Sequence, residues 1–206
     1  GYAGQFYAVL ATDPLLRDPA TTGLLDNPTY RATRILFPAA GWLLAGGDAA
    51  TAPRMYQFVV WTLGVALVLL VALWLRESGR SAWWATPLVV GAGMVASQVR
   101  SLTDAAAVGL IVAALWAYQR GKMAVSIALL TAAALGRETS LLATAAVAFV
   151  ELRSRRPARA VLFFTIPLLP LVAWKGYLWR LLHASANVFY VFDVPFAWVP
   201  AKLSRM

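Results

Sequence analysis

Apolar residues gather into six runs along the chain, and a more polar section of 54 residues precedes them. The polar section carries five prolines, whose close spacing prevents a single long helix. One or two short helices are expected in it, at Gln5–Ala11 and Arg31–Ala45. The second of these is amphipathic enough to lie at a membrane interface.

The runs have the lengths and composition of membrane helices. They are Tyr56–Leu75, Trp83–Val99, Ala105–Tyr118, Met123–Gly136, Ser140–Val150 and Ala160–Trp179. A 20-residue helix is about 30 Å long, which matches the hydrocarbon core of a bilayer. The pattern therefore predicts an all-α integral membrane protein with about six transmembrane helices and short helices in the N-terminal section.

Composition supports this class. Of the 206 residues, 61% are hydrophobic and 13% are charged, against about 45–50% and about 25% in soluble domains. The net charge of +9 does not indicate nucleic-acid binding, because no basic run alternates with aromatic residues as single-strand binders require. We expect membrane lipids as partners and no nucleic acid.

The basic residues predict the orientation. Eight of them fall in three short segments, at 76–80, 120–122 and 153–159, which alternate with breaks of mixed charge. By the positive-inside rule the basic segments are cytoplasmic. Three regions follow: an extracytoplasmic section 1–54, a helical bundle 55–180 and an extracytoplasmic tail 181–206. The sequence reads as the middle of a longer protein.

The mixed breaks place charges near the outer end of short helices. Arg100 and Asp104 lie in one break, and Arg137 and Glu138 lie in the other. Ionisable residues at such a depth normally face a bundle interior or a wet cavity. We therefore expect a polar cavity beneath the N-terminal section, although capping of a helix by Glu138 explains that residue equally well.

Several short motifs resemble one known group of membrane enzymes. "GQFY" at Gly4–Tyr7, "LDNPTYRATRILFP" at Leu25–Pro38, "TD" at Thr103–Asp104 and "GRETSLL" at Gly136–Leu142 are similar to segments of the GT-C glycosyltransferase superfamily. The nearest resemblance is to bacterial cell-surface glycopolymer or mannosyltransferase-like proteins. The matching pieces cover about a third of the chain.

The resemblance implies a function and a location. Such enzymes move a sugar from a polyprenyl-phosphate donor to a cell-envelope glycan or lipid acceptor, on the extracytoplasmic face of the bacterial inner membrane. An acidic residue of the first outer loop serves as base or orients the acceptor. This chain reads "YAGQFY" where the group has "YDGQFY", so Ala3 replaces the expected acid. We favour an enzyme, but the replacement of the expected acid by Ala3 leaves its catalytic activity open.

Sugar transfer needs a carboxylate to take the acceptor proton and positive charge for the leaving phosphate. The predicted catalytic acids are Asp26, Asp104 and Glu138. The predicted substrate-binding residues are Gln5, Tyr7, Asn27, Tyr30, Arg31, Arg34, Arg100 and Arg137. Simpler roles compete with these, since Asp26 or Asn27 could cap a helix and Arg31 with Arg34 could bind lipid headgroups.

No metal site is predicted, because His183 is the only histidine and the chain has no cysteine. A divalent cation held by carboxylates stays open, since Mg²⁺ needs only one or two of them.

Two functions other than sugar transfer also remain open. One is a subunit of a transporter or flippase that uses the same buried charges, and the other is a non-catalytic membrane scaffold.

Overall fold

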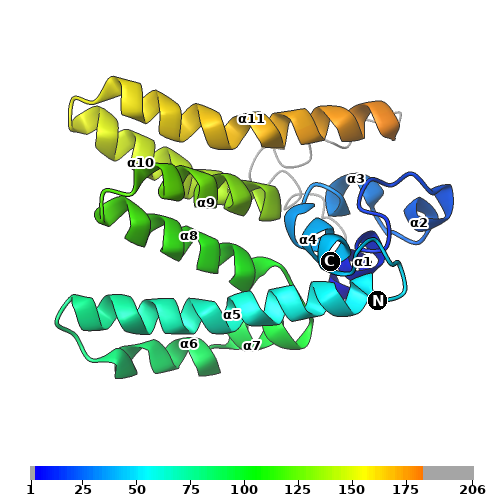
Figure 1. Ribbon diagram of the computed structural model, residues 1–206, viewed down its shortest axis with the longest axis horizontal. Coiled ribbons are helices and arrows are strands. Elements are labelled where there is room, and N and C mark those ends of the chain that lie inside the picture. Colours follow the sequence, from blue (N-terminus) through cyan, green and yellow to red (C-terminus); the bar gives the residue numbers. More distant parts are fainter. Residues whose placement is uncertain (1–2, 183–206) are drawn as a thin grey trace, which may run out of the picture.

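The structure is a computed structural model that describes residues 3–182, and within them all regular elements are helical (Figure 1). Four short helices come first: α1 (Ala3–Leu10), α2 (Pro19–Gly23), α3 (Pro28–Arg31) and α4 (Leu36–Leu44). Five longer helices are α5 (Ala52–Glu77), α8 (Asp104–Gln119), α9 (Met123–Gly136), α10 (Leu141–Arg153) and α11 (Pro157–Leu181). The remaining elements are η1 (Ala82–Ala85), α6 (Thr86–Val90), α7 (Ala92–Val99) and η2 (Glu138–Ser140). The all-α prediction is confirmed for the described residues, whereas His183 and most of the tail predicted at 181–206 lie outside them.

The five longer helices run side by side, and the short helices α1–α4 gather at one end of them (Figure 1). We call residues 3–51 the roof. The three loops that carry the basic residues, between α5 and η1, α8 and α9, and α10 and α11, all lie at the opposite end (Figure 1). The charged breaks before α8 and after α9 therefore face the roof.

Two helices have the length and composition needed to cross a membrane. They are α5 with 26 residues and α11 with 25 residues, which correspond to about 39 and 38 Å. Helices α7 and α8 together could form a third span, although they are bent by 118° at the break between them. These apolar helices support a membrane-associated protein.

Two segments expected to be single helices are broken. The run 83–99 divides into η1, α6 and α7, with Gly91 in an extended conformation (φ −60°, ψ 129°) between the last two. Glycine is a weak helix former, and Pro87 in the preceding turn lacks a backbone donor. The segment 31–45 divides into α3 and α4 because Pro38 can occupy only the first turn of a helix without a clash.

Glycines bring the roof into close contact with the bundle. The Cα of Gly4 packs against the backbone of Arg100, that of Gly41 against the backbone of Tyr56, and that of Gly136 against the ring of Phe37. A Cβ at Gly41 would lie 2.6 Å from the backbone nitrogen of Tyr56. The core at this junction includes Tyr7, Phe37 and Tyr56, which are all fully buried.

The Gly41 contact predicts a stability change. Replacing Gly41 with alanine is expected to lower the free energy of unfolding by about 1–3 kcal/mol, because the new methyl group forces α4 away from α5. Gly93→Ala is the matched control, since a Cβ there meets nothing within 4 Å. Thermal unfolding in detergent measures both changes, and equal midpoints for the two variants would contradict the close packing.

Candidate functional site

Arg34 is the centre of a polar cluster between the roof and the bundle. Its Nη1 donates to the Tyr7 hydroxyl at 2.7 Å and its Nη2 donates to the Tyr30 hydroxyl at 2.5 Å. Its Nε lies 3.8 Å from Oε2 of Glu138. Tyr7, Tyr30, Arg34 and Glu138 are called the Arg34 cluster below. Burial raises the pKa of Tyr7 and the Arg34 charge opposes that shift, so Tyr7 is a neutral phenol in this cluster.

Glu138 reaches the cluster because the chain turns sharply after α9. Arg137 is extended (φ −163°, ψ 123°) and ends α9, and the short η2 that follows carries Glu138 toward the roof. The Glu138 side chain is only 7% exposed. Its Oε1 has no hydrogen-bond partner among the described residues, and neither do the hydroxyls of Ser140 and Thr103. Buried polar atoms are nearly always paired, so each of these three atoms would gain a partner from a bound polar group or water.

Arg137 pairs elsewhere. Its guanidinium forms an ion pair with Asp104, the first residue of α8, and both side chains are about one-third exposed (34% and 35%). This pair joins the two charged breaks that the sequence analysis placed near the outer ends of short helices. Ion pairs of this exposure contribute little to stability, so Asp104 and Arg137 remain able to exchange partners.

Asp26 is held by Arg31 through two hydrogen bonds. Arg31 Nε donates to Asp26 Oδ1 at 2.9 Å and Nη2 donates to Oδ2 at 2.8 Å. The guanidinium also lies over the ring of Phe6, 5.0 Å from its centroid. The Arg31 hydrogen bonds lower the pKa of Asp26. Both carboxylate oxygens of Asp26 are therefore committed to an ion pair, which makes it a weak base.

The other predicted site residues lie outside the Arg34 cluster. Asn27 caps α3, with its side-chain oxygen accepting from the backbone nitrogen of Tyr30 at 3.0 Å. Gln5 and Arg100 are exposed. For Asn27 the structure thus bears out the capping alternative.

Tyr56, which the sequence did not single out, helps to build the site. The Tyr56 hydroxyl donates to the backbone oxygen of Ser101 at 2.5 Å, and Ser101 has a left-handed backbone (φ 49°). This bond steadies the turn that presents Asp104. Thr103 and Ser140 lie in the quoted motifs at 103–104 and 136–142, but no role of their own was predicted for them.

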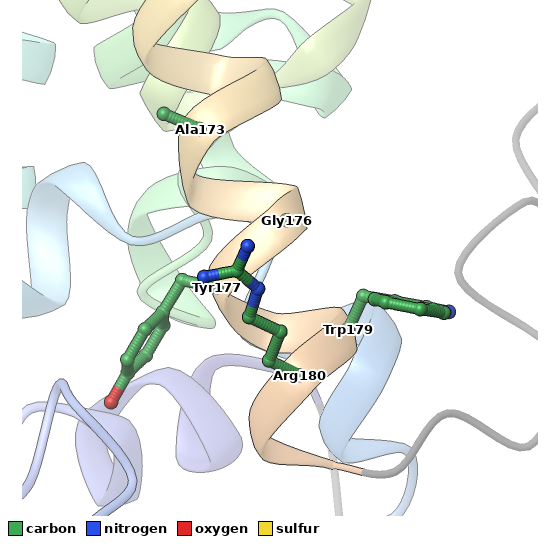
Figure 2. A pocket seen from close by; sticks show the side chains of 5 residues that line it. All are labelled: Ala173, Gly176, Tyr177, Trp179 and Arg180. Carbon is green, nitrogen blue, oxygen red and sulfur yellow. The ribbon is translucent and has the colours of Figure 1, made fainter.

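The surface has two described hollows away from this cluster. One, of about 420 Å³, lies on the last turns of α11, where Tyr177, Trp179 and Arg180 project from the helix (Figure 2). The other, of about 390 Å³, lies between α5 and the pair α6 and α7. No predicted site residue lines either hollow. Within residues 3–182, no group of three histidine, cysteine or acidic side chains is placed to hold a metal ion.

Comparisons with known protein families, with curated proteins and with solved structures find no match to this chain.

The lowered pKa of Asp26 predicts a pH dependence of stability. The ion pair with Arg31 favours the ionised carboxylate, so its contribution is fully present above the usual value of 3.8. That contribution is lost as pH falls through the lower pKa of the folded state. Asp26→Asn should therefore unfold at a lower temperature than the wild type at pH 7, and the difference should shrink below pH 3.8. A difference that persists unchanged at low pH would contradict the ion-pair explanation.

Proposed function

We propose that this chain belongs to a membrane glycosyltransferase of the GT-C type. It transfers a sugar from a polyprenyl-phosphate donor to a cell-envelope glycan or lipid acceptor on the extracytoplasmic face of the bacterial inner membrane. The observation that supports this proposal is the Arg34 cluster, where a buried carboxylate with one uncommitted oxygen lies next to an arginine. A carboxylate and a cation are the two groups that this transfer requires.

Glu138 is the acid best suited to act as the base. Its Oε1 has no hydrogen-bond partner among the described residues, so it can accept the acceptor's hydroxyl proton. Asp26 has both oxygens bound to Arg31, and Asp104 is paired with Arg137. Glu138 can supply the carboxylate that is missing at position 3, because it reaches Arg34 of the roof from the bundle side.

Arg34 and Arg137 supply the positive charge for the donor phosphate in this proposal. Arginine binds phosphate through a planar fork of donors. The Tyr7 and Tyr30 hydroxyls bind the two terminal nitrogens of Arg34. The Nε of Arg34 then lies on the side of Glu138. Arg137 can leave Asp104 for a phosphate at low cost because their ion pair is partly exposed.

A six-crossing arrangement belongs to the same proposal. The chain passes between the roof end and the basic end along α5, then η1 to α7, then α8, α9, α10 and α11 (Figure 1). The shorter passes would cross a bilayer that is locally thin, or one in which the roof replaces part of the outer leaflet. The basic loops then face the cytoplasm.

A transporter subunit is the second candidate, and one observation favours it. Interrupted helices line the substrate paths of many transporters, and the break at Gly91 between α6 and α7 is an interruption of this kind. A transporter would accumulate its substrate in sealed vesicles and leave the substrate chemically unchanged. Sugar transfer to an acceptor is the result that separates the two candidates.

Glu138→Gln tests the enzyme. In membranes supplied with a polyprenyl-phosphate sugar and a glycan acceptor, this variant is expected to transfer sugar about 10²–10⁴-fold more slowly than the wild type, as for loss of a general base. Glu151→Gln is the matched control, because Glu151 is also buried (3% exposed against 8% for Glu138) but lies at the basic end of α10. No transfer by the wild type, or equal losses in the two variants, would count against the proposal.

Cysteine labelling tests the orientation. Thr139 and Ser154 are exposed and lie at opposite ends of α10, and the chain has no cysteine of its own. Thr139→Cys should react with a membrane-impermeant thiol reagent added to intact cells, and Ser154→Cys should react only after the cells are opened. Reaction of Ser154→Cys in intact cells would reverse the proposed topology.

A further inference from the structure

An apolar groove runs along the outside of α5. Trp61, Val65 and Leu69 recur every fourth residue on one face of α5 and form one wall, since residues four apart share a helix face. Val89 of α6 and Val95 of α7 contribute to the other wall, and the groove encloses about 390 Å³. Because α5 is long and apolar enough to span a membrane, a groove on its surface opens toward lipid.

One polar residue lines this groove. Gln98 lies near the end of α7 and packs against Gly64 of α5, where a Cβ would meet its amide nitrogen. Neither amide atom of Gln98 has a hydrogen-bond partner among the described residues. Both atoms have almost no accessible surface in this packing, and buried polar atoms are nearly always paired. An acceptor carried by an occupant of the groove would supply that partner once the amide turns from Gly64 toward the groove.

A positive charge follows at the end of the groove nearest the roof. Arg100 comes directly after Val99, which lines the groove, and it caps the end of α7. Its side chain is exposed, and no ion pair is recorded for it within residues 3–182. A hydrocarbon wall, an amide donor and a guanidinium thus follow one another from the depth of the bundle toward the roof.

We propose that this groove is a binding site for a glycerophospholipid. One acyl chain lies against the α5 face, an ester carbonyl accepts from the Gln98 amide nitrogen, and the phosphate binds Arg100. A glycerophospholipid carries ester carbonyls directly below its phosphate, in the same order as the three features of the site. A polyprenyl phosphate has no polar atom between its phosphate and its hydrocarbon, so it would leave Gln98 without a partner. The site is separate from the proposed glycosyl transfer, and it assigns Arg100 to a lipid instead of the sugar donor.

The test uses the purified chain in detergent, with phosphatidylglycerol as the probe. Binding is measured by native mass spectrometry and by the rise in unfolding temperature. Arg100→Gln and Gln98→Leu should each weaken phosphatidylglycerol binding about tenfold, the size expected for one hydrogen bond to a charged or buried group. Val95→Trp should abolish binding by filling the groove. Val172→Trp on α11 is the matched control, because Val172 is exposed to a similar degree (55% against 45%) but lies outside the groove.

Binding of diacylglycerol distinguishes the role of Gln98 from that of Arg100, because this lipid has the ester groups but lacks the phosphate. Its binding should weaken in Gln98→Leu and stay unchanged in Arg100→Gln. Wild-type affinity for phosphatidylglycerol in both polar variants would overturn the proposal. Tighter binding of polyprenyl phosphate than of phosphatidylglycerol, insensitive to Gln98→Leu, would also overturn it and would assign the groove to the chain of a sugar donor.

Discussion

The burial of the Arg34 guanidinium is the constraint on which the junction between roof and bundle depends. Arginine does not lose its proton in proteins, so a side chain that is 12% exposed must be surrounded by acceptors. Two of them, the Tyr7 and Tyr30 hydroxyls, belong to the roof, and Glu138 belongs to the bundle. Removing one partner of a buried ion pair costs about 3–5 kcal/mol. The roof is therefore held in one position over the break between α9 and α10.

Much of the fold could be predicted from hydrophobic runs and breakers. The run at Met123–Gly136 coincides with α9, and the ends of α8 and α11 lie within three residues of the predicted ones. The break at Gly91 could not be found in this way, because the apolar run continues across it. Hydropathy reports burial and not backbone conformation, so a break inside an apolar run is visible only through Pro87 and Gly91.

The candidate site was predictable as a set of residues but not as pairs. Asp104, Arg137 and Glu138 stood out as charges beside short apolar runs, and Arg34 stood out in the motif at Leu25–Pro38. Glu138 follows Arg137 directly in the sequence, but the structure pairs it with Arg34, which is 104 positions away. Long-range pairing depends on how the helices pack, and no local pattern encodes it. The Tyr56 bond to Ser101 was missed for the same reason.

The separation of Arg137 from Glu138 has a consequence for chemistry. Arg137 is extended at the end of α9 and Glu138 begins η2, and Arg137 pairs with Asp104 while Glu138 lies beside Arg34. The first pair is partly exposed. The second is buried, and there an uncompensated charge is felt strongly because the local dielectric constant is low. The more exposed pair is the more accessible of the two to a charged ligand, and Glu138 lies deeper with an uncommitted oxygen. In the proposed transfer this difference suits a phosphate bound at Arg137 and a reacting hydroxyl held at Glu138.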